Sequence, residues 1–81
     1  MRGHIVRIPK DKHFGFIHGE NSTEYFFHKA DFDGHWDNLV LDFYNNRNRQ
    51  KIQVEFQIDL NSPKGPRAEK VKRLDWPNQY A

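Results

Sequence analysis

KHFGFI at residues 12–17, followed by YFFH at residues 25–28, decides the fold expected for this chain. Both stretches are rich in aromatic and branched residues, which favour strands, and the side chains of a strand alternate between its two faces. If Ile17 and Phe27 lie on the buried face, four side chains share the opposite, exposed face: Phe14, Phe16, Phe26 and His28. Exposed rings of this kind are stacking surfaces for nucleobases.

An ordinary core is the alternative role for these rings, because most phenylalanines are buried. A small barrel has only one inner face to fill, however, and here both faces of each strand are apolar or aromatic. Some of the rings are therefore expected outside. Basic residues flank them, which favours a polyanionic partner: Arg7, Lys10, Lys12 and Lys29.

Length and composition limit the chain to one small domain. With 81 residues, 36% of them hydrophobic, it can form a single modest core, which we place in residues 1–74 with a short tail at 75–81. It has no cysteine, which excludes disulfides, a thiolate metal site and a cysteine nucleophile. A closed sheet is one way for so short a chain to bury enough apolar surface.

The charge balance is only slightly basic. Thirteen Lys and Arg against eleven Asp and Glu leave a net charge of +2, which by itself does not identify a nucleic-acid binder. No segment approaches the ~18 apolar residues that span a membrane, and the first residues have no apolar run behind them. We therefore expect a cytoplasmic protein with no membrane partner.

Five segments have the pattern of strands. The clearest is 50–59, where Ile52, Val54, Phe56 and Ile58 alternate with polar residues. The expected strands are residues 4–8, 13–18, 24–29, 50–59 and 67–74. They predict an all-β fold, a five-stranded antiparallel OB-fold barrel of the partly open type that binds oligonucleotides.

The connection at residues 30–49 is the longest in the chain. Apolar residues recur there at three- and four-residue spacing, which predicts a short helix over residues 36–44 that covers one end of the barrel. Trp36 has two candidate roles, a loop ring that stacks on a base or a cap on the barrel core. Residues 45–49 are expected to form an exposed polar loop, and the roles of this loop and of Trp76 stay open.

The motifs of this chain resemble those of the cold-shock domains. Residues 12–17 are similar to that family's K-G-F-G-F-I motif, and residues 25–28 to its V-F-V-H motif. Residues 54–56 are similar to its fourth strand, and KGPRA at 64–68 to its K-G-P-x-A segment. The resemblance implies an OB-type barrel that binds single-stranded RNA or DNA without catalysis or cofactor, as a nucleic-acid chaperone or a regulator of gene expression.

The resemblance also assigns residues, with three departures from the family pattern. Arg7 stands where the family usually has Trp, Lys29 where it has an aromatic residue, and His13 where it has Gly. Two rings are thus replaced by two cations, as in a bacterial subgroup with F-F-H-R in the third strand, so binding should depend more on electrostatics. The candidate nucleic-acid-binding residues are Arg7, Lys12, Phe14, Phe16, Phe26, His28, Lys29, Trp36, Lys64 and Arg67.

Other function classes are less well supported by the sequence. The five histidines show no spacing typical of a catalytic metal site, and Ser22 and Ser62 lie in turns without an activating motif, so we expect no catalytic residue, no metal and no small-molecule substrate. A protein-interaction adaptor that uses the aromatic face is the alternative function. A monomer is expected, with a strand-exchanged dimer as the alternative.

Overall fold

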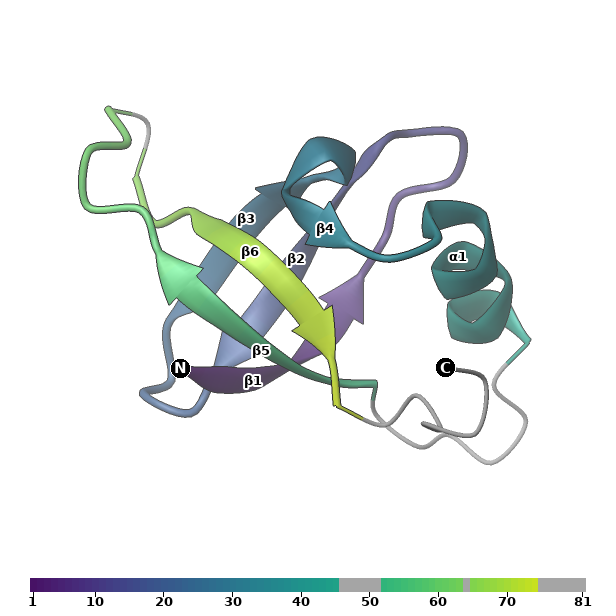
Figure 1. Ribbon diagram of the computed structural model, residues 1–81, viewed down its shortest axis with the longest axis horizontal. Coiled ribbons are helices and arrows are strands. Elements are labelled where there is room, and N and C mark those ends of the chain that lie inside the picture. Colours follow the sequence, from purple (N-terminus) through teal and green to yellow (C-terminus); the bar gives the residue numbers. More distant parts are fainter. Residues whose placement is uncertain (46–51, 64, 75–81) are drawn as a thin grey trace.

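The computed structural model of this protein describes residues 1–45, 52–63 and 65–74. These residues form a six-stranded sheet, one α-helix and one short 3-10 helix (Figure 1). The strands are β1 (Arg2–Arg7), β2 (Phe14–Gly19), β3 (Glu24–His28), β4 (Phe32–Asp33), β5 (Gln53–Ile58) and β6 (Ala68–Arg73). The helices are η1 (Lys29–Asp31) and α1 (Trp36–Tyr44).

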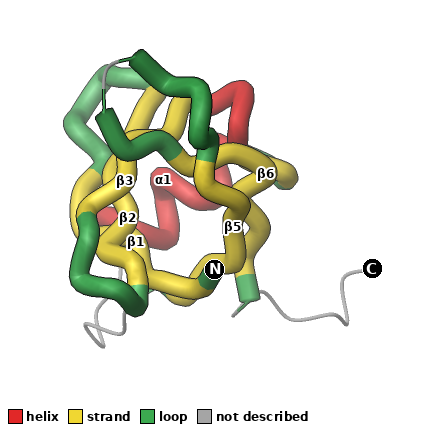
Figure 2. The backbone as a smooth tube through the Cα atoms, turned by 90° about the vertical axis from the view of Figure 1, so that its left-hand side faces the viewer, coloured by secondary structure: helices red, strands yellow, loops and turns green. Residues whose placement is uncertain are grey.

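The sheet curls into a nearly closed barrel. Its strand order is β3-β2-β1-β5-β6-β4, so β3 and β4 are formally its edges. A bridge between Phe26 of β3 and Arg67, just before β6, joins the two sides, and the Phe26 N–H donates to the Pro66 carbonyl at 3.1 Å. Figure 2 shows the resulting ring of strands, with α1 behind it. The all-β barrel predicted from the sequence is therefore confirmed.

The number of strands differs from the prediction, because the structure has six where five were expected. The extra strand, β4, contains only Phe32 and Asp33 and pairs in parallel with β6, opposite Val71 and Lys72. Two residues are too few to show an alternating pattern, so the sequence had no periodicity by which this strand could be recognised. The parallel pair also corrects the expectation of a purely antiparallel sheet.

The core fills the inside of the barrel with the inward residues of the strands. Ile17 of β2, Phe27 of β3 and Val54 of β5 are fully buried, and no polar side chain of the described residues is buried. Gly15 makes room for one of these rings, because a Cβ atom at this position would lie 2.9 Å from Phe27. The glycine between Phe14 and Phe16 thus lets the Phe27 ring pass beneath the outer face of β2.

Helix α1 has the predicted bounds and covers one end of the barrel (Figure 1). Trp36 and Leu39 point into the core, with exposed fractions of 6% and 0%. The Arg73 guanidinium of β6 donates to the Asp42 carboxylate at 2.8 Å, and the Tyr44 hydroxyl donates to the Ile8 carbonyl. Apolar burial and these two polar contacts attach the helix to the sheet.

Several sequence predictions lie outside the described residues. They are the tail at 75–81 with Trp76, all but the first residue of the polar loop at 45–49, and the basic residue Lys64. Among the helices that the structure describes, none has the length and apolar character needed to cross a membrane.

Candidate nucleic-acid interface

The outer face of β2 and β3 presents the aromatic residues predicted from the alternation. Phe16 lies directly opposite Phe26, and Phe14 lies opposite His28. Their neighbours Ile17 and Phe27 are turned inward and fully buried, whereas the outer phenylalanines remain partly exposed and lie outside the core cluster. The sheet therefore separates the aromatic residues of these two strands into core rings and surface rings, as the sequence predicted.

The three surface rings touch one another and form one aromatic surface, which we call the platform (Phe14, Phe16 and Phe26). The Phe14 and Phe26 centroids are 5.4 Å apart, and Phe16 lies 5.9 Å from each of them. The Phe16 ring stands nearly edge-on to Phe14, at an interplanar angle of 88°. Such tilted and edge-on pairs hold rings in place, so the platform is arranged before any ligand arrives.

Arg7 reaches the platform because of a bulge in β1. It follows the buried Ile5 by two positions, so strict alternation would turn its side chain into the barrel. The pairing with β2 shifts between them, since Ile5 is opposite Ile17 while Arg7 is opposite Phe16. Val6 is the extra residue of this bulge, and its insertion turns the Arg7 side chain outward. Its Cζ lies 5.4 Å from the Phe16 ring centroid, within cation–π distance.

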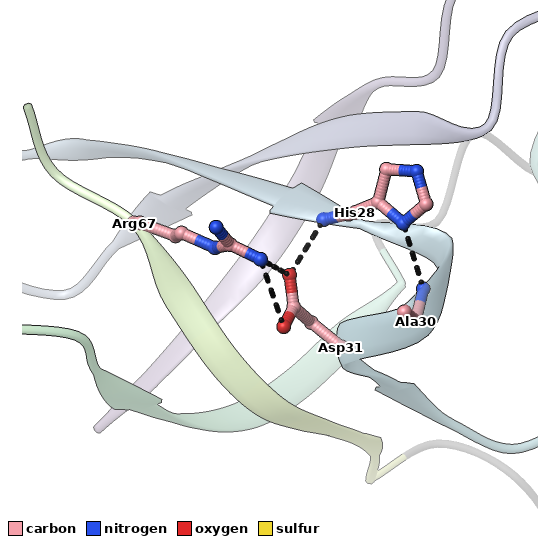
Figure 3. A network of polar contacts seen from close by, with 4 residues as sticks. All are labelled: His28, Ala30, Asp31 and Arg67. Atoms are coloured by element: carbon pink, nitrogen blue, oxygen red, sulfur yellow. Dashed lines mark hydrogen bonds and ion pairs between the residues drawn. The ribbon is translucent and has the colours of Figure 1, made fainter. Parts of the chain in front are cut away.

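The His28 side chain has a defined orientation at the end of β3. Its Nδ1 accepts a hydrogen bond from the Ala30 N–H at 3.0 Å, and its backbone N–H donates to the Asp31 carboxylate at 2.9 Å (Figure 3). The two bonds form a capping box around η1. Because Nδ1 is an acceptor, the proton of the neutral imidazole is on Nε2, which makes Nε2 a hydrogen-bond donor for a ligand.

Asp31 is itself held by Arg67. The Arg67 guanidinium donates to both carboxylate oxygens, at 3.0 and 3.3 Å (Figure 3). The Asp31 side chain is only 14% exposed, against 39% for Arg67. This pair joins the segment before β6 to the end of β3, so Arg67 positions His28 through Asp31. Asp31 was not among the residues predicted from the sequence, although its three-residue spacing from His28 is that of a capping box.

Two of the predicted cations lie at one end of the platform. Lys12 is exposed in the turn before β2, and Lys29 is exposed directly after His28. The two segments are adjacent, because the Lys29 N–H donates to the His13 carbonyl at 2.7 Å. Positive charge therefore lies beside the Phe14 and His28 end of the platform, and Arg7 adds a third cation beside Phe16.

Trp36 does not belong to this surface. It is buried in the core, where its ring centroid lies 5.9 Å from that of Phe27 and 6.2 Å from that of Phe32. Of the two roles left open by the sequence, the structure shows the barrel cap. Trp36 is the first residue of an amphipathic helix whose apolar side closes the barrel end. Its indole is therefore packed against the core and is not available to a ligand.

One hollow of the described surface lies away from the platform, over β4, β5 and β6. It encloses about 730 Å³ and is lined by four carboxylates, including Asp31 and Glu55, and by two lysines. This excess of negative charge is unfavourable for a phosphate backbone. Among the described residues, no three histidine or acidic side chains lie close enough together to hold a metal ion.

Comparison of the chain with protein-family models and with curated proteins finds no match.

Proposed function

We propose that this protein binds single-stranded nucleic acid, RNA or DNA, without catalysing a reaction. The observation that carries the proposal is the platform, three phenyl rings in mutual contact outside the core with the Arg7 guanidinium beside them. Partly exposed rings on a sheet offer π-faces to unpaired bases, and neighbouring cations offer partners to phosphates. Bases inside a duplex are already stacked on one another, so the platform favours single strands.

The expected affinity follows from the number of rings. Each base stacked on an aromatic side chain contributes ~1–3 kcal/mol, so three rings supply roughly 3–9 kcal/mol before the cost of ordering the strand. An affinity of about 1 μM corresponds to −8.2 kcal/mol and lies within this range. If Arg7, Lys12 and Lys29 each contact one phosphate, log affinity falls with log salt at a slope of about −2.

The barrel itself is compatible with the OB architecture that the cold-shock resemblance implies. In such barrels oligonucleotides bind to the face of the strands that carry the aromatic residues, here β2 and β3. The four residues that the resemblance assigns to stacking are paired with one another across β2 and β3, Phe14 with His28 and Phe16 with Phe26, which supports the proposal. The cations at Arg7 and Lys29 favour a polyanion over an uncharged protein surface as the partner of this face.

A titration with three ligands tests the proposal. The protein is titrated with fluorescent oligo(dT), oligo(U) and a duplex of matched length, at low and at high salt. We expect both single strands to bind more tightly than the duplex, with affinity that falls as salt rises. Failure of both single strands to bind at low salt would overturn the proposal and favour a protein partner for the platform.

A further inference from the structure

A pair of histidines continues the platform along the same face of the sheet. His4 of β1 lies opposite His18 of β2, and the centroids of their rings are 5.4 Å apart at an interplanar angle of 47°. His18 follows Phe16 by two positions, so the two side chains lie on the same outer face. The imidazole of His18 is exposed and that of His4 is partly exposed.

The distance from Phe16 to His18 along β2 equals the distance from Phe14 to Phe16, because each pair is separated by two strand residues. Positions 14, 16 and 18 of β2 follow each other at intervals of about 6.7 Å, twice the rise of one strand residue. A single strand laid along them would be stretched to about twice the 3.4 Å rise per nucleotide of B-DNA, and a flexible unpaired backbone can adopt this spacing. The rings of His4 and His18 are then the next aromatic surface that a strand leaving Phe16 would meet.

A hollow beside the pair offers room for a ligand. It has a volume of about 370 Å³ and lies where β1 begins and β2 ends, and its lining includes Arg2, His4, His18, Glu20 and Gln53. The polar groups of this lining include the imidazole rings of both histidines and the amide of Gln53, which lies opposite His4 in the sheet. These groups can stack on a base and form hydrogen bonds with its edge.

The charges at this end favour a base over a phosphate. Glu24 of β3 lies opposite His18, and Glu20 lines the hollow, so two carboxylates lie near the rings. Arg2 lies 3.8 Å from Glu55, which reduces its availability to an anion. A phosphate would be repelled by the carboxylates, whereas an uncharged base would not.

We propose that His4 and His18 form an additional base-binding position, which takes the next base of the single strand bound on the platform. This inference rests on the proposed function. The histidine pair adds a position at the end of the binding surface that is remote from Lys12 and Lys29. At this end we expect the protein to contact a base rather than a phosphate.

The test measures affinity as a function of oligonucleotide length. Oligo(dT) is lengthened in single-nucleotide steps from a dinucleotide to a decamer, and each length is titrated against the wild type, His18→Ala and His18→Phe. The matched control is His35→Ala, which removes an exposed histidine whose side chain makes no capping bond at the start of α1. Thermal melts establish that each variant is folded.

We expect His18→Ala to bind the shortest ligands as the wild type does, but to lose a gain of about fivefold at the length that reaches the histidine pair. His18→Phe should keep that gain, because it retains a ring, and His35→Ala should leave the curve unchanged. The inference is overturned if His18→Ala shows the full wild-type gain at every length. It is also overturned if His18→Phe loses the gain along with His18→Ala.

The proposed function fails in a different way. If the wild type binds no length of oligo(dT), or if Phe26→Ala binds all lengths as the wild type does, the platform is not the binding surface and the histidine pair has no strand to extend. A length series in which His18→Ala loses only the last gain, while shorter ligands bind as tightly as to the wild type, supports both the platform and the histidine pair.

Discussion

Removal of the Phe16 ring should weaken binding and leave the fold intact. Phe16 is the central ring of the platform, in contact with Phe14, Phe26 and Arg7. Phe16→Ala removes one stacking surface, worth ~1–3 kcal/mol per base, which corresponds to roughly a 5- to 150-fold weaker affinity. It also releases the neighbouring rings, so the upper part of that range is expected.

The cost to stability is smaller than that of a core substitution. Phe16 is only partly buried, and loss of its ring contacts should lower the free energy of unfolding by about 1–2 kcal/mol. A domain of this size has about 4–12 kcal/mol in total, so Phe16→Ala should remain folded. Phe27→Ala provides the contrast, because this fully buried ring should cost about 3–5 kcal/mol.

The assay combines a thermal melt with a titration of oligo(dT) for Phe16→Ala, Phe27→Ala and a control. Leu41→Ala is the matched control, since Leu41 is 57% exposed on α1 and lies outside the platform. Affinity should fall for Phe16→Ala alone, when it is expressed per folded molecule, and stability should fall most for Phe27→Ala. If Phe16→Ala unfolds while its folded fraction binds as tightly as the wild type, the platform acts as core and the reasoning is refuted.

Three further predictions test the surroundings of the platform and the strain in the sheet. Asp31→Asn removes the charge that holds the His28 N–H and the Arg67 guanidinium, so it should lower stability by ~1 kcal/mol and weaken binding at an unchanged salt slope; wild-type affinity would contradict a role in positioning His28. Arg7→Gln should make the slope of log affinity against log salt shallower by about 0.7, and an unchanged slope would show that Arg7 contacts no phosphate. Lys70 has a φ of 52° within β6, so Lys70→Gly should stabilise the fold by up to ~1 kcal/mol in a denaturant melt, whereas Lys72→Gly should destabilise it; equal effects would exclude strain at position 70.

The alternation along the strands was enough to assign the faces of the barrel. Because side-chain direction repeats every two residues, Ile17 and Phe27 could be assigned to the core and Phe16 and Phe26 to the surface before the pairing of the strands was known. The same local reasoning located α1, whose apolar residues repeat with the helical period. These features depend on residues that are close in the sequence.

Contacts between distant segments were decided only by the tertiary structure. The bulge in β1 that turns Arg7 outward depends on how β1 pairs with β2, and the pair of Asp31 with Arg67 depends on the closure of the barrel. Trp36 shows the same limit, because the sequence allowed both a surface and a core role until the packing of α1 enclosed the ring. Periodicity specifies which way a side chain points along one element, but only the assembled sheet determines which side chains from different elements meet.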